Sequence, residues 1–425
     1  MEESALEPHD PYASLRIPSY RWFILSTLTM TLAAQIQGVV VAWQIYDFTH
    51  DPLSLGLIGL AEALPYIGVA LFAGHVADRE NRRAIALASL AVLVFCSVSL
   101  LFLSLGMSFH SGAGMHRSIS GFYGVIFLSG IARSFLQPAR QALGAELVPR
   151  HLYPNAVAWR SSTWQTGAVA GPAVGGLLYG FTSPSFAYGV DVTLMIIALI
   201  AFATIDYVPR GTRQIQASIG ESLRTGIGFV FAEPVLLGAM TLDLFSVLLG
   251  GAEALLPVFA DQILRVGPQG LGVLRAAPAA GAMVMSIYLA HRRPFQRAGR
   301  TLLCAVGLFA ACIIGFGLSR SFELSLVLLA ISGMADNVSV VIRSTLLRVL
   351  TPEHLLGRVS SVNAIFIGSS NELGAFESGV AAKLLGTVTS VILGGVASMT
   401  VVGIVAAKIP TLRRLRDIAM RPAQA

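Results

Sequence analysis

Long runs of apolar residues alternate with short polar connections along almost the whole chain. A bilayer core about 30 Å thick is crossed by a helix of roughly 20 apolar residues, and most of these runs reach that length. The pattern therefore predicts an all-α membrane protein with twelve transmembrane helices. The first six expected spans are Tyr20–Tyr46, Leu53–Ala77, Ala84–Leu105, Gly121–Ala139, Asn155–Phe181 and Phe186–Ile205. The second six are Pro234–Ile263, Gly270–Leu289, Thr301–Leu318, Leu324–Leu346, Leu355–Leu385 and Val388–Ala407.

One stretch of the chain recurs without a gap. Residues Ser129–Leu152 match Ser332–Leu355, an offset of 203 residues. The similarity continues more faintly to Gly171/Gly374 and Gly176/Gly379. Self-similarity in an apolar chain is typical of a transporter built from two related halves, with its substrate path between them. The identical positions are Ser129/Ser332, Gly130/Gly333, Ala132/Ala335, Arg140/Arg343, Leu143/Leu346, Leu147/Leu350, Pro149/Pro352, His151/His354 and Leu152/Leu355.

The runs and the repeat together predict the domain organisation. Two pseudo-symmetric six-helix halves are expected at residues 20–205 and 234–407, with tails at 1–19 and 408–425 and a linker at 206–233. Within the linker, Glu221–Phe231 gathers apolar residues on one helical face. This segment indicates either a short helix lying at the membrane surface or an ordinary linker helix.

Composition agrees with a membrane protein and narrows its function. Hydrophobic residues make up 55% of the chain and charged residues 12%, against about 25% charged residues in soluble domains. With both termini in the cytoplasm, most of the 29 Lys and Arg residues fall in cytoplasmic connections, as the positive-inside rule requires. They are dispersed among many loops, so no nucleic-acid surface is predicted.

The sequence gives no support for an enzyme. Neither lysine, Lys383 nor Lys408, follows a glycine as a Walker A loop requires. The histidines and cysteines form no metal-ligating cluster, and there is no Gly-x-Ser-x-Gly nucleophile turn. We therefore expect no cofactor and no metal. A sensor built on a transporter fold would call for a large soluble domain, for which the chain has no room between its spans.

The connection between the second and third spans resembles the signature loop of the major facilitator superfamily. It keeps Gly74, Ala77, Asp78-Arg79 and Arg82-Arg83, with Asn81 in place of the second glycine of the pattern. The resemblance implies the two-half major facilitator fold. It also implies a cytoplasmic gate that Asp78 and Arg140 help to hold shut, and Gly74 is expected to let two helices approach closely. The alternative is that this charged loop only fixes the topology.

The fifth span carries a second resemblance, to the Gly-Pro motif of exporters in this superfamily. Small residues spaced four apart allow close helix packing, and a proline inside a helix removes one backbone hydrogen bond and bends it. We expect a packed and kinked helix here, although generic membrane packing would use similar residues. The motif residues are Gly167, Gly171, Pro172, Gly175 and Gly176.

Further stretches resemble the siderophore (enterobactin) exporter and multidrug efflux branch of the superfamily. The resemblance implies a monomeric protein of the cytoplasmic membrane that exports a siderophore-like or drug-like molecule by alternating access, as a proton antiporter. Uptake, or flipping of a lipid-like substrate, is the alternative for the same fold. The stretches are Ala42–Ile45 with Thr49–Asp51, Pro234–Gly238, Leu249–Ala252 with Ala254–Ala260, and Thr351–Val359.

Ionisable residues inside the spans are the candidates for substrate and proton binding, because each is costly at bilayer depth unless it faces a cavity or a partner. Arg133 and Asp336 are equivalent under the repeat yet opposite in charge. We expect both to face the cavity, where they bind a polar or anionic substrate or form a salt bridge that breaks in the cycle. Local neutralisation is the alternative. The full set of candidates is Glu62, Arg133, Asp243, Glu253, Asp336 and Glu372.

Coupling to protons requires a carboxylate that gains and loses a proton near neutral pH. Glu62 and Asp243 lie at mid-depth in their spans and are the first candidates, followed by Glu253, Glu372 and Asp191. Aromatic residues such as Trp43 and Trp164 could stack on a planar substrate, although packing and interfacial anchoring are their more common uses.

Overall fold

The computed structural model describes residues 10–107, 113–207, 219–292 and 295–415. Regular structure in these ranges is helical throughout. The first half comprises α1 (Pro18–Thr49), α2 (Pro52–Arg79), α3 (Arg82–Met107), α4 (Ala113–Glu146), α5 (Tyr153–Phe181) and α6 (Pro184–Ala203). The second comprises α8 (Pro234–Leu249), α9 (Leu256–Val258), α10 (Gly267–Ala290), α11 (Ala298–Leu318), α12 (Phe322–Leu350), α13 (Glu353–Leu385) and α14 (Thr387–Lys408).

The predicted spans are helical, and the described ranges hold 10 segments that are both long and apolar enough to cross a membrane. The other two predicted spans are the helices α5 and α13, of 29 and 33 residues. They are long enough to span but carry more polar residues. Both lie at the boundary between the halves, where polar side chains need not face lipid. The prediction of an all-α membrane protein is confirmed: 10 of the twelve predicted spans meet both criteria, and α5 and α13 meet the length criterion alone.

The seventh predicted span departs from a single helix. Helix α8 ends at Leu249, and a 3-10 turn at Ala252–Leu255, α9 and a π-turn at Phe259–Ile263 complete the segment. The adjacent glycines Gly250 and Gly251 explain the break, because glycine has low helix propensity. Glu253 lies in the 3-10 turn with an exposed side chain, so it is not a mid-helix group as the apolar pattern had indicated.

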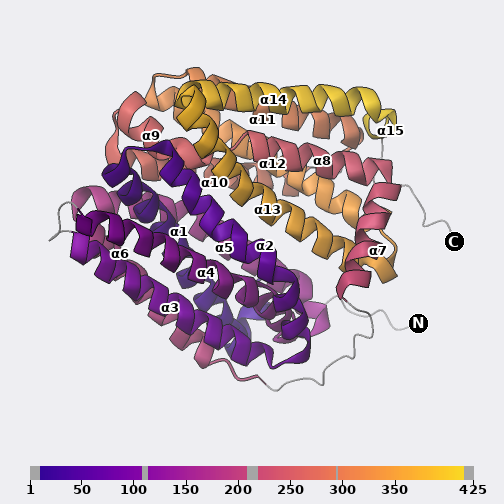
Figure 1. Ribbon diagram of the computed structural model, residues 1–425. Coiled ribbons are helices and arrows are strands. Elements are labelled where there is room, and N and C mark those ends of the chain that lie inside the picture. The colour runs from indigo at the N-terminus through magenta and orange to yellow at the C-terminus, as the bar shows by residue number, and fades with distance from the viewer. Residues whose placement is uncertain (1–9, 108–112, 208–218, 293–294, 416–425) are drawn as a thin grey trace.

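The two halves lie side by side as separate bundles, and the last described helix, α15, lies at one end of them (Figure 1). We call this the terminal end and the other the opposite end. The linker forms α7 (Ile219–Ala232), which packs against α13 at the terminal end. Whether α7 lies at a membrane surface stays a prediction. The last short helix, α15 (Pro410–Arg413), packs against α8 and α11.

The internal repeat is visible in the packing of equivalent residues. A β-carbon on Gly130 of α4 would come within 2.7 Å of the Pro65 ring of α2. At the equivalent place in the second half, a β-carbon on Gly333 of α12 would meet the Pro278 backbone of α10. Each half thus seats its fourth helix on the proline of its second helix through a glycine, which lets the two backbones approach.

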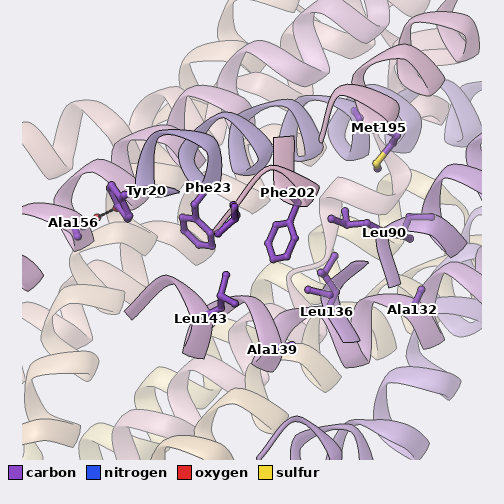
Figure 2. Close-up of a cluster of buried hydrophobic side chains, with 14 of the residues drawn as sticks. Tyr20, Phe23, Leu90, Ala132, Leu136, Ala139, Leu143, Ala156, Met195 and Phe202 are labelled. Carbon is purple, nitrogen blue, oxygen red and sulfur yellow. Dashed lines mark hydrogen bonds between the residues drawn. The ribbon is translucent and has the colours of Figure 1, made fainter. Parts of the chain in front are cut away.

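The interior of the first half is formed by large side chains from several helices. Tyr20 and Phe23 of α1, Leu143 of α4 and Phe202 of α6 are each no more than 1% exposed and lie in one cluster (Figure 2). The hydroxyl of Tyr20 donates to the carbonyl of Ala156 in α5. Because lipid is itself apolar, such clusters stabilise the bundle through close packing more than through removal of apolar area from water.

The seam between the halves is built from glycines toward the opposite end. Gly176 of α5 lies against Gly272 of α10, and Gly56 of α2 lies against Gly379 of α13, so that a β-carbon on any of the four would come within about 3 Å of the facing backbone. Gly176 and Gly379 are repeat equivalents. The two contacts therefore join equivalent pairs of helices, α5 with α10 and α13 with α2, and each brings backbone against backbone.

Polar contacts join the halves at the same end. The Lys383 Nζ of α13 lies 2.5 Å from Oδ2 of Asp51, which caps the start of α2. Gln262 donates to the hydroxyl of Tyr46 at 2.6 Å. Partial burial raises the pKa of Asp51, but hydrogen bonds from Lys383 and the Leu53 backbone and the lysine charge hold it below its ordinary value of 3.8. The bridge is therefore present at neutral pH and is lost only as the pH falls below that value.

Candidate functional site

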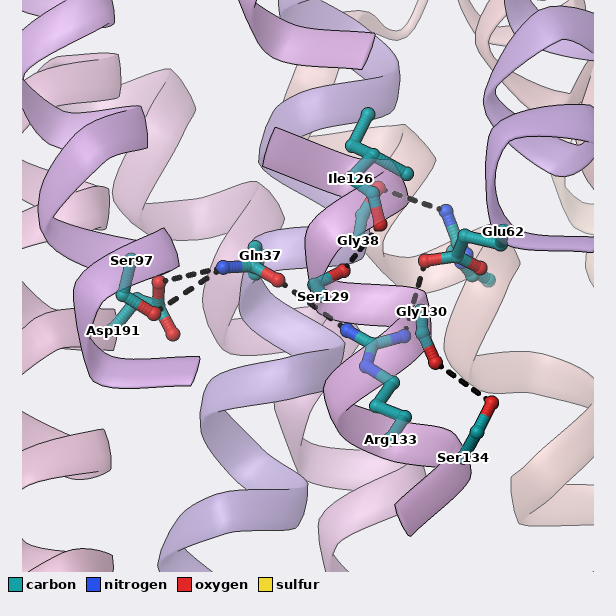
Figure 3. A network of polar contacts seen from close by, with 11 residues as sticks. Gln37, Gly38, Glu62, Ser97, Ile126, Ser129, Gly130, Arg133, Ser134 and Asp191 are labelled. Carbon is teal, nitrogen blue, oxygen red and sulfur yellow. Dashed lines mark hydrogen bonds and ion pairs between the residues drawn. The ribbon is translucent and has the colours of Figure 1, made fainter. Parts of the chain in front are cut away.

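A polar network crosses the first half at the middle of its helices (Figure 3). Arg133 of α4 donates to Glu62 of α2 at 3.0 Å and to the side-chain oxygen of Gln37 of α1 at 3.4 Å. The amide nitrogen of Gln37 in turn donates to Asp191 of α6 at 3.2 Å and to Ser97 of α3 at 3.3 Å. Helices α1, α2, α3 and α6 thus join α4 in one chain of hydrogen bonds, which ends at the fully buried carboxyl group of Asp191.

The second half reaches into this network from two helices. Arg275 of α10 donates to the backbone carbonyl of Gly38 in α1 at 3.1 Å. Glu372 of α13 lies where α13 packs on α2, with its backbone carbonyl against Gly59, and its carboxyl is within the electrostatic reach of Glu62, Arg133 and Arg275. Two arginines and two glutamates from opposite halves therefore meet across the seam.

Arg275 is a residue that the sequence prediction missed. In α2 and α10 the residues Glu62 and Arg275 each stand three positions before a proline, Pro65 and Pro278. Glycines flank both at the same spacing, with Gly59 and Gly68 in α2 matching Gly272 and Gly281 in α10. Aligning these helices would have shown a second position, beside Arg133/Asp336, at which the repeat inverts the charge.

Arg133 and Asp336 do not form the pair that the repeat suggested. Arg133 is bridged to Glu62 within its own half. Asp336 lies beside Asp243 at a space of about 10 Å³, too small for a substrate. Asp243 forms a buried salt bridge with Arg343 of α12. The two halves thus hold separate charge clusters, and only that of the first half reaches the seam.

A larger pocket of about 240 Å³ lies in the first half. Arg133, Gln137 and Arg140 of α4 line it, together with Gln35 of α1 and Trp164 of α5. Arg133 and Arg140 are seven residues apart, so they share a helix face and are separated by about 10 Å along the axis. The Trp164 side chain is 51% exposed. The pocket is large enough for a small organic group with polar and aromatic surface.

In the predicted gate at the signature loop, the side chains of Asp78 and Arg79 lie outside the described residues. No described atom comes within 4 Å of a β-carbon on Gly74, so this glycine makes no close helix contact, contrary to expectation. Arg82 bridges Glu146 of α4, and Arg83 donates to the carbonyl of Ala203 at 2.6 Å. Both partners belong to the first half.

The exporter motif of α5 forms a packing surface. Gly167, Gly171 and Gly175 face α1, where β-carbons would meet Thr31, Gln35 and Ile36. Gly176 faces α10 across the seam. Pro172 lies inside a helix that continues from Tyr153 to Phe181, and its backbone carbonyl lies against Gly272.

The tryptophans Trp43 and Trp164, and Trp159 of α5, separate into two kinds. Trp43 is 6% exposed and packs on Tyr179, 6.4 Å between ring centroids. Trp159 binds the N-terminal segment, where its indole N–H donates to the Pro11 carbonyl at 2.9 Å. These two are structural. Trp164 remains available to a ligand because it lines the pocket.

Comparison with known proteins identifies the family. Residues 9–424 match the model of the transmembrane secretion effector family. The chain is 26% identical over 402 residues to the enterobactin exporter EntS of Shigella flexneri, and 25% identical to that of Escherichia coli O1:K1. Each alignment covers 94% of both chains.

Solved structures agree on the fold. A POT family transporter in complex with 5-aminolevulinic acid superposes with a TM-score of 0.69 at 13% identity, covering 92% of this chain and 96% of its own. A bacterial homologue of the lysosomal transporter Spinster gives 0.67 at 15%, covering 96% and 99%. At such low identity they show the fold alone. With the family match over nearly its whole length, the chain belongs to the transmembrane secretion effectors of the major facilitator superfamily, and it is a multi-pass membrane transporter.

Proposed function

We propose that this transporter exports a siderophore-like or drug-like molecule across the cytoplasmic membrane by alternating access, in exchange for protons. Similarity to enterobactin exporters along 94% of both chains supports the substrate class and the direction. The observation that carries the coupling is the position of Glu62 and Glu372, which belong to opposite halves and lie where α2 packs on α13.

Two carboxyl groups can hydrogen-bond to each other only when one of them holds a proton. A shared proton therefore stabilises the closed seam at Glu62 and Glu372. Loss of that proton leaves two carboxylates facing each other, and their repulsion favours separation of the halves. Proton release on the cytoplasmic side would then promote opening outward, and protonation from outside would promote the return. This order is the one that an antiporter requires.

The arrangement of the seam supports an inward-facing state. Gly176–Gly272, Gly56–Gly379 and the Asp51–Lys383 bridge join the halves toward the opposite end. The pocket beside Arg140 lies further toward the terminal end. With the termini in the cytoplasm, as the distribution of Lys and Arg favours, the joined end faces outward. We propose that the protein works in this orientation as a monomer, with the signature loop acting as the gate of the cytoplasmic side.

Everted membrane vesicles test both export and coupling. We expect vesicles that contain the protein to accumulate enterobactin when their interior is more acidic than the medium. For exchange of one proton per molecule, a gradient of two pH units supports an accumulation of at most about 100-fold. Glu372→Gln should retain exchange of enterobactin but lose its response to the gradient, because the shared proton can no longer leave.

The control for this experiment lies on the same helix. Glu377→Gln changes a glutamate of α13 that is not part of the network, and the response to the gradient should persist. Gradient-driven accumulation by the Glu372→Gln variant would refute the coupling site. Absence of accumulation by the unmodified protein would refute export of enterobactin, and accumulation in right-side-out vesicles would assign uptake instead.

Cross-linking tests whether the seam must open at the opposite end. In a background with Cys96, Cys304 and Cys312 replaced by serine, Asp51→Cys and Lys383→Cys can be joined by a short thiol-specific cross-linker. Transport should then nearly cease and return on reduction, because the halves can no longer separate there. The Lys383→Cys single variant, treated in the same way, should transport normally. Undiminished transport after complete cross-linking would contradict alternating access through this seam.

A further inference from the structure

We propose that Arg140 and Trp164 form a binding subsite for a planar aromatic anion, such as an aromatic carboxylate, in the pocket of the first half. The proposal rests on the proposed function in so far as the bound molecule is the exported one. The starting observation is an arginine in the interior of a helix bundle without a counter-ion. Within the described part of the chain, Nη1 of Arg140 is buried and has no hydrogen-bond partner.

The surroundings of Arg140 leave its charge uncompensated. Among the residues whose side chains the structure describes, the ionisable group that acts on it is Arg160 of α5, another cation. Arg133, which lines the same pocket, is bridged to Glu62, so its charge is already balanced. A buried guanidinium without an anion is unfavourable, and in a membrane protein such a group indicates a functional site. In the described part of the chain, the pocket therefore has no negative charge next to Arg140.

The repeat supplies an internal comparison. Arg343 is the equivalent of Arg140 in the second half, and it is bridged to Asp243. Asp243 is in α8, whose counterpart in the first half is α1. The part of α1 that lines the pocket beside Arg140 offers no carboxylate and presents Thr31 and Gln35 instead. The same arginine is thus neutralised by protein in one half and left for a ligand in the other.

Trp164 and the pocket shape define the rest of the ligand. Trp164 exposes half of its side chain and lines the same space as Arg140. A guanidinium is planar and binds a carboxylate through two parallel N–H groups, and an indole face offers stacking to an aromatic ring. The amide side chains of Gln35 and Gln137 also line the pocket, where they can hydrogen-bond to hydroxyl groups of a ligand. An aromatic ring bearing a carboxylate satisfies all of these groups together.

Binding to the purified full-length protein in detergent tests the subsite without any need for transport. The probe is 1-naphthoate, with the uncharged 1-naphthamide as its matched analogue. We expect naphthoate to quench tryptophan fluorescence, and Trp164→Phe to remove most of the quenching. Arg140→Gln should weaken naphthoate binding roughly ten- to a hundredfold, as expected for loss of a charge-assisted hydrogen bond. Binding of naphthamide should be weak in both proteins.

Stability separates a binding role from a structural one. Because Arg140 has no partner in the empty pocket, Arg140→Gln should raise the Tm of the ligand-free protein by a few degrees, about 3 °C. Arg150→Gln, at an exposed position, should change neither the Tm nor the affinity for naphthoate. A lower Tm with unchanged naphthoate affinity would assign Arg140 a structural role and overturn the proposal.

Two further outcomes are decisive. Equal affinities for naphthoate and naphthamide would overturn the anion site. A tenfold gain of naphthoate affinity in Asp78→Asn would show that Asp78 already neutralises Arg140, and would place Arg140 in the signature-loop gate rather than in a ligand site. The test is independent of the proposed function, because a protein that binds naphthoate through Arg140 but does not accumulate enterobactin would retain the subsite and lose the assigned cargo.

Discussion

Replacing Arg133 by Gln is expected to slow substrate efflux by roughly 30- to 100-fold, the equivalent of one hydrogen bond to a charged group. Arg133 is the cation that joins Glu62, through its salt bridge, to the buried Asp191, through Gln37. Without it, the carboxyl groups of Glu62 and Glu372 lose their nearest positive charge. The initial rate of enterobactin efflux from proteoliposomes measures the effect.

The size of the guanidinium matters as well as its charge. Arg133→Lys keeps the charge but cannot donate to Glu62 and Gln37 at once, so we expect partial recovery. The matched control is Arg150→Gln, on an exposed turn, which should leave the efflux rate unchanged. Wild-type efflux by a folded Arg133→Gln variant would show that the network has only a structural role.

Replacing Arg343 by Met should destabilise the protein by about 3–5 kcal/mol, because Asp243 would remain buried without a partner. The two side chains are 9% and 8% exposed, and Asp336 adds a further acidic group nearby. The double variant Asp243→Asn/Arg343→Met should recover most of the loss, since no unpaired charge remains. The free energy of unfolding of the detergent-solubilised protein, measured in heat- or denaturant-induced unfolding, gives these differences.

The matched control is Arg348→Met, an exposed position on the same helix, for which a change within about 0.5 kcal/mol is expected. A loss of less than 1 kcal/mol for Arg343→Met would contradict the buried pair. The sign of the effect also distinguishes the halves. Substitution of Arg343 should lower stability, whereas substitution of its equivalent Arg140 should raise it.

Most of the fold could be predicted from the sequence, because span length and hydropathy are local properties. The apolar runs located the helices and the repeat located the halves. The break after α8 was not predicted, since Gly250 and Gly251 stand in an apolar context that resembles a continuous span. Helices α5 and α13 were recognised as spans despite their weaker hydropathy. The structure explains this weaker hydropathy, because both helices lie at the seam between the halves.

The site was less predictable, because pairing of charges depends on which helices become neighbours. Arg133, Glu62 and Glu372 were identified as intramembrane charges, but the salt bridge between Arg133 and Asp336 that was one expected role of this pair is not formed, and Arg133 pairs with Glu62 instead. Arg275 was missed because the recognisable repeat, with its single offset of 203 residues, does not extend to α2 and α10, which match at an offset of 213. Gly74 was assigned a close contact from its motif alone, although no described atom lies near it in this conformation.

The glycine pairs of the seam have a consequence for the energetics of switching. A glycine has no side chain to immobilise, so bringing Gly176 against Gly272 or Gly56 against Gly379 costs no rotamer entropy. Separating them releases none. The two end states can therefore stay close in free energy over a wide range of temperature, and the rate of interconversion should follow the breaking of van der Waals contacts. A transporter built in this way can cycle at low and high temperature with the same contacts between its halves.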